Sequence, residues 1–255
     1  MAMYAEERQQ QILTLARTKG RVDVTALAKS LDVTTETVRR DLDRLVRQGL
    51  LTRVHGGAIP HNRIDFEPEL SKRDTMATAE KSRIARAALS LLPRQGTILI
   101  DGGTTTARLA AAVPDDSELT FATNAWPIAS LLSNRPGATV HLIGGRIRRR
   151  TMAAVDAWAL EAIASINVDV ACLGTNGVSV KRGLTTPDAS ECAIKAAMIE
   201  SARKVVILAD SSKYDNNHFA RFARLGDVDV IISDGGLTEP AREAIMEAGP
   251  DVLIA

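Results

Sequence analysis

The sequence has few cysteines, few aromatic side chains and no long apolar run, and each shortage excludes a class of protein. Two cysteines in 255 residues cannot form the disulfide framework of a secreted scaffold. Aromatic residues make up 3%, too few for single-strand binding by base stacking. No apolar run approaches the roughly 18 residues that cross a bilayer, so we expect no membrane partner. Because Glu6 and Glu7 stand where a signal peptide needs cations, we expect a cytoplasmic protein.

The composition is otherwise ordinary for a globular protein, with 45% apolar and 25% charged residues. The formal net charge is +1, but the charges are unevenly distributed. Residues 1–60 carry 10 Lys and Arg against 7 Asp and Glu, whereas the other 195 residues carry 22 against 24. This asymmetry is a weak indication of nucleic-acid binding at the front of the chain. The histidines have no metal-ligand spacing with the cysteines, and we expect neither a metal nor a cofactor.

The first 58 residues predict three short helices followed by a β-hairpin. We expect Thr25 to cap the second helix and Thr34 to cap the third. A strand over residues 50–55 and a Gly56-Gly57 turn follow. The third helix has apolar residues at the spacing of one buried face, namely Val38, Leu42, Leu45 and Val46. Helix, tight turn and helix is the helix-turn-helix arrangement, and the hairpin would form a wing.

The opposite face of the third helix is polar and cationic. It carries Glu36, Arg40, Arg44 and Arg47, with Thr35, Thr37 and Arg39 near the N-terminal end. Such a helix fits the major groove of DNA, where arginine binds guanine or phosphate. Arg53 and His55 of the wing would lie near the DNA backbone or the minor groove. The alternative is a solvated helix with ordinary surface arginines.

The remainder of the chain changes in composition. Residues 59–75 contain two prolines and little periodicity, so we interpret them as a linker. In residues 76–255, helical stretches alternate with apolar runs, at residues 98–100, 119–122, 139–143, 168–173, 204–209, 228–232 and 252–254. Continuous runs of Val, Ile and Leu are typical of strands buried on both faces. They predict a mostly parallel sheet covered by helices.

Polar residues follow five of these runs directly. The five segments are Asp101–Thr106, Thr123-Asn124, Gly144–Arg146, Gly174–Gly177 and Asp210–Lys213. In an open parallel sheet these positions share the carboxyl edge, where ligands bind. Their convergence predicts a pocket for a small molecule.

The first segment, Asp101-Gly102-Gly103-Thr104-Thr105-Thr106, has the composition of a phosphate-binding loop. Glycines let the backbone approach an anion, threonines supply hydroxyls, and the following helix presents free N–H groups. The alternative is a strand-to-helix turn that needs only glycine and a threonine cap.

Four charged residues are open to a functional or a surface role. Glu191 and Lys195, four residues apart on a helix, could form a surface ion pair. Lys213 could equally lie in solvent. In the basic run at residues 146–150 we favour a solvated loop, with Arg146 as the best phosphate candidate because it follows Gly144-Gly145.

Two stretches near the N-terminus carry a family resemblance. Residues 33–42, VTTETVRRDL, and residues 49–58, GLLTRVHGGA, resemble the N-terminal signature of the DeoR family of bacterial transcriptional regulators. Thr34 stands where the family usually has Ser, and Val38 where it usually has Ile. The resemblance implies a winged helix-turn-helix that binds operator DNA. The residues it places at the DNA are Thr34, Thr35, Glu36, Thr37, Arg39, Arg40, Arg44, Arg47, Arg53 and His55.

Residues 76–235 resemble the sensor domain of the same regulators. The motifs include DGGTTT at 101–106, LGTNG at 173–177, GLTTP at 183–187 and DSSK at 210–213. That domain is similar in fold to ribose-5-phosphate isomerase and glucosamine-6-phosphate deaminase, which implies a phosphorylated sugar as effector. The implied effector-binding residues are Asp101, Gly102, Gly103, Thr104, Thr105, Thr106, Thr123, Asn124, Gly145, Arg146, Asn176, Gly177, Glu191, Lys195 and Lys213.

One position departs from the family. Asp156-Ala157 stands where Gly-Pro is common, so either the backbone is reshaped there or a carboxylate faces the pocket.

The fold expected from these observations is α/β: a small winged helix-turn-helix joined to a larger sensor domain. The expected function is a repressor of a carbohydrate uptake or catabolism operon, released from DNA by a phosphorylated sugar. We expect a homo-oligomer, because one module with about four phosphate contacts binds too weakly at physiological salt. The alternative is a sugar-phosphate isomerase or deaminase with an appended DNA-binding module.

Overall fold

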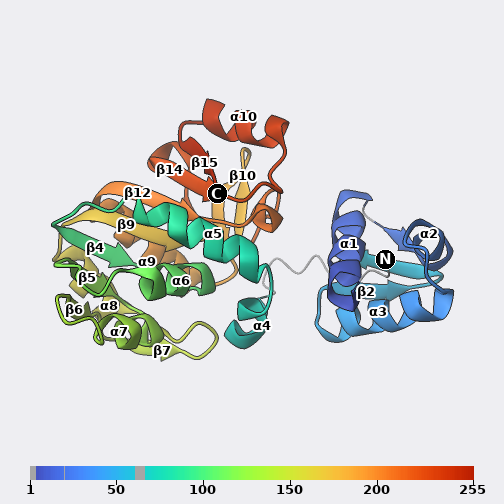
Figure 1. Cartoon of the computed structure of the whole chain (residues 1–255), viewed down its shortest axis with the longest axis horizontal. Helices are drawn as coiled ribbons and strands as arrows, with labels where there is room; N and C mark the ends of the chain where they lie inside the picture. The colour runs from blue at the N-terminus through green and yellow to red at the C-terminus, as the bar shows by residue number, and fades with distance from the viewer. Residues whose placement is uncertain (1–3, 20, 61–66) are drawn as a thin grey trace. The chain divides into compact units, whose positions relative to one another are not determined.

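The computed structural model describes residues 4–19, 21–60 and 67–255. The chain divides into two compact units, Met1–Pro68 and Glu69–Ala255. Figure 1 shows the first in blue and the second in colours from cyan to red.

The first unit is a winged helix-turn-helix, as the sequence predicts. Its elements are α1 (Ala5–Lys19), β1 (Val22–Asp23), α2 (Val24–Ser30), α3 (Thr35–Arg47), β2 (Leu51–Val54) and β3 (Gly57–Pro60). The three strands form an antiparallel sheet in the order β1-β3-β2. The predicted apolar face of α3 is confirmed, because Val38, Leu42 and Leu45 are buried in the core of this unit.

The cap of the second helix differs from the prediction. The helix begins at Val24, and Asp23 rather than Thr25 is its N-cap. The Asp23 carboxylate accepts hydrogen bonds from the backbone N–H groups of Thr25 at 2.8 Å and Ala26 at 3.1 Å. A charged acceptor two residues earlier therefore satisfies the free N–H groups. The predicted Thr34 cap of α3 is confirmed, because its hydroxyl accepts from the Thr37 N–H at 3.1 Å.

The second unit is built on a seven-stranded parallel sheet. In chain order its strands are β4 (Thr97–Ile100), β5 (Thr120–Thr123), β6 (Thr139–Leu142), β9 (Val168–Gly174), β12 (Ala202–Leu208), β14 (Val230–Ser233) and β15 (Asp251–Ile254). In the sheet they follow the order β15-β14-β12-β9-β4-β5-β6, and every neighbouring pair is parallel. The seven apolar runs of the sequence are these seven strands, and the predicted fold class is confirmed.

The central strands of this sheet are largely buried, whereas the edge strands β6 and β15 are mostly exposed. Both faces of the sheet are covered by helices. They are α5 (Thr78–Leu89), α6 (Thr104–Ala112), α7 (Trp126–Leu132), α8 (Ala157–Ala164), α9 (Ala189–Glu200) and α10 (Glu239–Glu247). Ile98 and Ile100 of β4 pack in the core with α5, α6 and α7, whereas Leu99 packs in the core with α8 and α9. Figure 1 shows α5 and α6 lying across the sheet.

Several short elements are added to this layered core, and the sequence did not indicate them. They are α4 (Leu70–Asp74), the hairpin β7 (Arg146–Arg148) and β8 (Ala153–Val155), and the strands β10 (Gly177–Ser179), β11 (Gly183–Thr186) and β13 (Ala220–Ala223). The last three form an antiparallel sheet. Two 3₁₀ turns, η1 (Ser211–Lys213) and η2 (Leu225–Asp227), complete the unit.

The predicted linker at residues 59–75 overlaps regular structure at both ends. Strand β3 extends to Pro60, and α4 occupies Leu70–Asp74. Residues 61–66 of the predicted linker lie outside the described residues. Among the residues that the structure describes, no helix combines the length and apolar character that a membrane span requires.

Candidate nucleic-acid interface and ligand site

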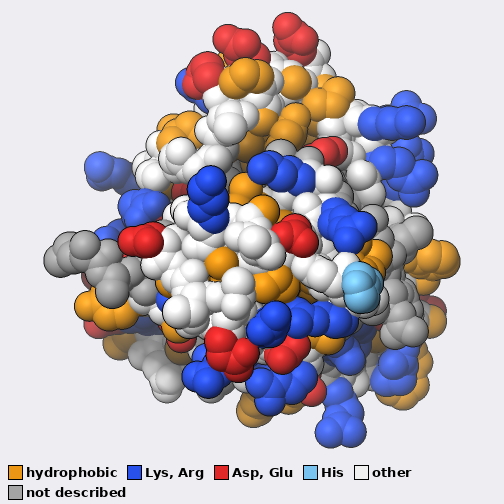
Figure 2. All heavy atoms as spheres, turned by 90° about the vertical axis from the view of Figure 1, so that its right-hand side faces the viewer, with side chains coloured by type: hydrophobic (Ala, Val, Ile, Leu, Met, Phe, Trp, Pro, Cys, Tyr) orange, Lys and Arg blue, Asp and Glu red, His pale blue; other side chains and the backbone are white. Residues whose placement is uncertain are grey.

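The outer face of α3 carries the predicted DNA-contacting residues into solvent. The exposed residues are Thr34, Thr35, Glu36, Arg39, Arg40, Arg44 and Arg47, while Thr37 is half-buried. Arg40 has a 79% exposed side chain and lies 3.5 Å from Glu36, which is also 3.7 Å from Arg39. Figure 2 shows Lys and Arg side chains in several groups on one face of the molecule, with Asp and Glu side chains beside them. Exposed ion pairs of this kind are weak, so these arginines can be redirected to DNA phosphates or bases.

The hairpin β2–β3 presents the other two predicted DNA contacts. Arg53 and His55 are exposed, and Arg53 lies 3.8 Å from Asp43 of α3. The turn contains Gly56 at φ 77°, a backbone conformation that side chains with a Cβ rarely adopt. Arg21 donates to the His55 carbonyl at 2.9 Å and holds the turn of the hairpin. The wing therefore projects its cations from a fixed turn.

Sequence reasoning missed one polar residue within α3. Asp41 is buried, and its carboxylate accepts hydrogen bonds from Arg8 at 2.5 Å and Gln9 at 2.8 Å. A buried carboxylate with two donors fixes the rotation of α3 against α1. This residue therefore helps determine which side of α3 faces solvent. The sequence signal for its burial is its position next to Leu42, on the side of α3 that is buried.

In the second unit, the five polar segments lie at one edge of the sheet. They follow β4, β5, β6, β9 and β12, which are consecutive neighbours in the parallel sheet. Adjacent strands are about 4.8 Å apart, so the segments after β6 and β12 are separated by on the order of 19 Å. The five polar segments therefore form a row along this edge, and Asp101, directly after β4, lies near the middle of the row.

Asp101 and Lys195 form a buried ion pair at the middle of this row. The Lys195 ammonium group is paired with the Asp101 carboxylate and donates to the Gly174 carbonyl at 2.9 Å. The same carboxylate accepts from the Gly174 N–H at 3.1 Å. The ammonium group also lies 5.5 Å from the centre of the Phe222 ring. The contact connects β4, β9 and α9, so the alternative of a surface Glu191–Lys195 pair is wrong.

Glu191 is held by a separate polar network on the same helix. Its carboxylate accepts from Thr151 at 2.5 Å and from Arg148 at 3.2 Å, and lies 3.4 Å from the Thr186 hydroxyl. Arg148 also pairs with Asp188 at 3.0 Å. Burial alone would raise the pKa of Asp188, but the Glu191 backbone N–H and Arg148 lower it overall. The network attaches the β7–β8 hairpin to α9.

Within the basic run at residues 146–150, the structure selects a different arginine from the one that the sequence favoured. The Arg146 side chain is 62% exposed, whereas the Arg148 side chain is 15% exposed and reaches Glu191. Strand alternation does not account for this difference, because residues 146 and 148 lie on the same face of β7. Arg148 is less exposed because it pairs with Asp188 and Glu191 of the α9 region. Arg148 is therefore a candidate site residue that sequence reasoning missed.

Asp156, which stands where the family commonly has Gly, has a backbone conformation typical of glycine. Asp156 has φ 98° and ψ −172°, a region that residues other than glycine rarely occupy. One carboxylate oxygen accepts from the Arg146 N–H at 3.2 Å, and the other is buried without a hydrogen-bond partner. The carboxylate thus faces the Gly145-Arg146 turn, and strain at Asp156 is retained rather than relieved by reshaping.

The threonine-rich segment is buried and tightly packed. Thr104, Thr105 and Thr106 are buried in the first turn of α6, and the Thr106 hydroxyl donates to the Gly103 carbonyl at 3.0 Å. A Cβ on Gly102 would lie 2.8 Å from the Ala153 Cβ. Packing against β8 thus explains glycine at position 102, and the approach of an anion there stays a prediction.

The remaining predicted residues of the row are fixed by local hydrogen bonds. The Thr123 hydroxyl accepts from the Ala125 N–H at 3.1 Å, and the Asn124 amide donates to the Ala154 carbonyl at 2.9 Å. The Asn176 N–H donates to the Thr185 carbonyl at 3.2 Å, and Gly177 pairs with Thr185 across β10 and β11. These residues shape the edge of the sheet around Asp101.

The far end of the row contains two lysines and one aspartate. Lys213 lies 4.0 Å from Asp210, and Lys81 of α5 is the second lysine. Burial, together with the positive charge of Lys213, lowers the pKa of Lys81 to about 8, and the negative charge of Asp210 opposes this shift. Burial would raise the pKa of Asp210, but Lys213, Ser212 and Lys81 lower it overall. Lys81 was missed because a lysine on an amphipathic helix usually lies in solvent.

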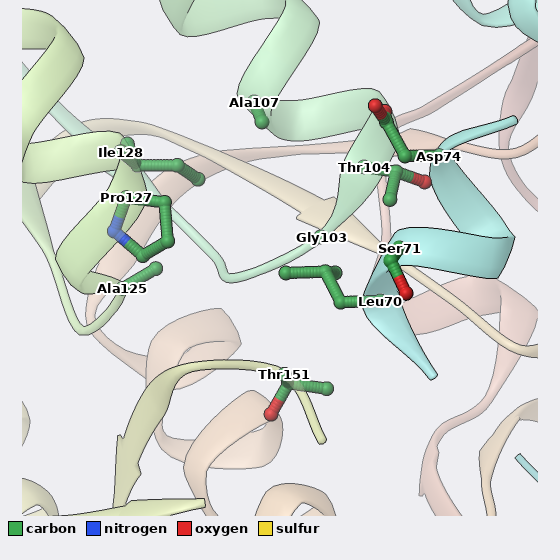
Figure 3. Close-up of a pocket in the computed structure, with 10 residues that line it drawn as sticks. All are labelled: Leu70, Ser71, Asp74, Gly103, Thr104, Ala107, Ala125, Pro127, Ile128 and Thr151. Carbon is green, nitrogen blue, oxygen red and sulfur yellow. The ribbon is translucent and has the colours of Figure 1, made fainter. Parts of the chain in front are cut away.

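A cavity of about 430 Å³ lies beside the threonine-rich segment. Figure 3 shows Leu70 pointing from α4 into this cavity, with Asp74 and Thr104 on the same side. Its lining residues are Leu70, Ser71, Asp74, Gly103, Thr104, Ala107, Ala125, Pro127, Ile128 and Thr151.

The described residues contain no cluster of three or more His, Cys, Asp or Glu suited to a metal ion. The chemistry that the row offers is binding of an anionic, hydroxylated molecule by Lys, Arg, Thr and backbone N–H groups.

Comparison with known proteins gives matches over both units. Residues 8–63 match a DeoR-like helix-turn-helix domain, and residues 76–235 match a DeoR C terminal sensor domain. The HTH-type transcriptional regulator GlpR of Haloferax volcanii is 36% identical over 98% of this chain and 98% of its own. The HTH-type transcriptional repressor GlcR of Bacillus subtilis is 31% identical over 99% of this chain and 97% of its own.

Among solved structures, ribose 5-phosphate isomerase A of Methanocaldococcus jannaschii aligns with 52% of this chain and 53% of its own. The TM-score is 0.39 and the sequence identity is 16%. A similarity of this size carries no conclusion about function.

Proposed function

Because this chain belongs to the DeoR family of transcriptional regulators, we propose that it is a repressor of a carbohydrate uptake or catabolism operon that a phosphorylated sugar releases from operator DNA. The observation that carries the proposal is the arginine-bearing outer face of α3, on a chain whose second unit holds a buried cationic and hydroxyl-rich row. A DNA-binding surface and a candidate anion site on one chain are the two parts that a ligand-controlled regulator requires. The compartment for this activity is the cytoplasm.

In the DNA-bound state, α3 lies in the major groove and the β2–β3 hairpin contacts the backbone. The support is the exposure of Arg40, Arg44 and Arg47 on one side of α3, with the apolar side buried. A single module of this size makes too few phosphate contacts for tight binding at physiological salt. The protein therefore acts as a homo-oligomer that holds two half-sites, about one helical turn apart or a multiple of it.

In the ligand-bound state, the phosphate lies at the threonine-rich segment, and the sugar hydroxyls lie along the row toward Lys195 and Glu191. Supporting features are the buried threonines of α6 and the buried polar side chains after β4 and β9. Ligand binding favours an arrangement of the oligomer in which the DNA-binding units no longer match the half-site spacing. The two binding equilibria are then linked reciprocally.

This site binds its ligand without converting it. Asp101, the carboxylate nearest the middle of the row, is occupied by Lys195 and the Gly174 N–H, and a base engaged in this way is poorly placed to take a substrate proton. Incubation of the purified protein with a panel of sugar phosphates tests this directly. Turnover at rates typical of enzymes would favour the isomerase or deaminase alternative.

The regulatory function is tested on the full chain with DNA selected by the protein from a random duplex pool. Fluorescence anisotropy at fixed salt gives the affinity for the selected duplex, before and after addition of phosphorylated sugars. We expect at least one of them to weaken binding about tenfold or more, and its unphosphorylated counterpart to have no effect. No duplex enriched above the random pool, or no response to any phosphorylated sugar, would contradict the proposal.

A further inference from the structure

The short helix α4 forms one wall of the cavity beside the threonine-rich segment. Leu70, Ser71 and Asp74 face the cavity from α4, and Gly103 and Thr104 face it from the start of α6. No residue of α4 is buried, so the helix is not anchored by an apolar core contact. Its attachment to the second unit depends on polar contacts, which an incoming charged group can replace.

The main polar contact of α4 is with Arg108 of α6. The guanidinium group lies 2.5 Å from the Asp74 carboxylate and donates to the Asp74 carbonyl at 2.9 Å. It also donates to the Thr104 carbonyl at 3.0 Å. The Arg108 side chain is 18% exposed, and the cavity is lined by Asp74 rather than by Arg108. Asp74 thus stands between the cavity and the cation behind it.

An anionic ligand in this cavity competes with Asp74 for Arg108. Its negative charge would repel the Asp74 carboxylate, and the planar fork of an arginine binds phosphate as readily as carboxylate. The two anions cannot both occupy the guanidinium edge that the Asp74 carboxylate contacts. A phosphate that binds Arg108 therefore removes the ion pair with Asp74 and leaves α4 attached through fewer contacts, among them the hydrogen bond from Lys81 to the Arg73 carbonyl.

The position of α4 in the chain gives this competition a consequence. The first unit ends at Pro68, and Leu70, which lines the cavity, is two residues further on. No other regular element separates the cavity wall from the unit boundary.

We infer that Asp74 is a resident competitor of the ligand phosphate for Arg108, and that transfer of Arg108 from Asp74 to the phosphate undocks α4. The inference rests on the proposed function, since it describes how ligand binding at the same site changes the segment next to the unit boundary at Pro68. Arg108 becomes a ligand-binding residue, and Asp74 sets the affinity by opposing the ligand.

Calorimetric titration of the full chain with inorganic phosphate tests the competition. D74N should lower the Kd for phosphate about fivefold, because the competing charge is gone. R108A should raise the Kd about tenfold. E80Q and R83A are matched controls, because Glu80 and Arg83 form an exposed ion pair 3.8 Å apart on α5. An unchanged Kd in D74N, an equal decrease in D74N and E80Q, or no phosphate binding by any of these proteins would overturn the inference.

Amide hydrogen exchange of residues 69–75 tests the undocking. Saturating phosphate should accelerate exchange in this segment of the wild type and leave the amides of α10 unchanged. Slower or unchanged exchange at 69–75 would overturn the inference. DNA affinity is measured separately. If exchange responds to phosphate but DNA binding responds to no phosphorylated sugar, the proposed function fails and this inference stands.

Discussion

The ammonium group of Lys195 and the carboxylate of Asp101 are paired inside the second unit, with each side chain 5% exposed. They are 94 residues apart in sequence and come from α9 and the end of β4. Their contact joins a helix on one face of the sheet to the edge where the polar segments meet. The pair is therefore both a structural connection and a candidate part of the ligand site.

Removal of one member of this pair should cost more than removal of both. K195M leaves the Asp101 charge buried and unpaired, which lowers the free energy of unfolding by about 3–5 kcal/mol. The double variant D101N/K195M removes both charges and should be more stable than K195M. Chemical denaturation measures the order, with K181M at an exposed position as control. A loss of stability in the double variant equal to the summed losses in D101N and K195M would show that the two groups do not interact.

The double variant should also separate the two functions. We expect D101N/K195M to bind the selected duplex with wild-type affinity and to resist release by the phosphorylated sugar that releases the wild type. Anisotropy with and without that sugar measures both. Normal release would place the ligand site elsewhere.

Arg40 should contribute to DNA binding without affecting stability. Its side chain is exposed and its partner Glu36 is exposed as well, so R40A leaves the core of the first unit intact. If Arg40 binds a base, R40A weakens DNA binding by about 1–3 kcal/mol and relaxes specificity at one position. If it binds a phosphate, the slope of log affinity against log salt falls by about one. R83A, in the second unit, is the control, and an unchanged affinity in R40A would contradict the orientation assigned to α3.

Asp156 should be a site of measurable backbone strain. Its φ of 98° costs on the order of 1–3 kcal/mol for a residue with a Cβ. D156G relieves this strain but loses the hydrogen bond to the Arg146 N–H, worth about 1 kcal/mol. We expect D156G to be at least as stable as the wild type, and D156A, which keeps the strain and loses the bond, to be less stable than both. Equal stability of D156A and D156G in chemical denaturation would contradict the strain.

Lys81 should make stability depend on pH in the alkaline range. The pKa of the buried amine is about 8 in the folded protein against an ordinary value of 10.5. Between these values the folded protein binds fewer protons than the unfolded chain, so the free energy of unfolding rises with pH. Relative to K81M, the wild type should gain up to about 3 kcal/mol across that range. An exposed lysine replaced in K181M should not produce this difference, and a flat difference for K81M would contradict the burial.

The sequence predicted the elements whose signals are local. Seven apolar runs predicted the seven strands, although only the central ones are largely buried. The edge strands β6 and β15 are mostly exposed, which the apolar runs did not predict. Thr34 predicted the start of α3, because a cap acts on residues two or three positions away. The helix α4 could not be predicted, since its five residues are held by Arg108 and Lys81 from later in the chain.

In the candidate site, too, features with a local signal were predicted, and contacts between distant parts of the chain were not. Asp101 and Lys195 were recognised by their positions after a strand and on a helix, but their mutual contact is a property of the fold. Arg148 was passed over for Arg146, because the short hairpin that orients them has no sequence signal of its own. Lys81 was missed because a charged residue on a helix is normally exposed.

The coupling of the two sites is tested most directly by measuring both affinities in both states on the full chain. The Kd for the selected duplex is determined with and without the releasing phosphorylated sugar, and the Kd for the sugar with and without duplex. Reciprocal coupling requires each partner to weaken binding of the other by the same factor, about tenfold or more. If neither the Kd for the duplex nor the Kd for the sugar changes at saturating concentrations of the other partner, the two sites are not coupled.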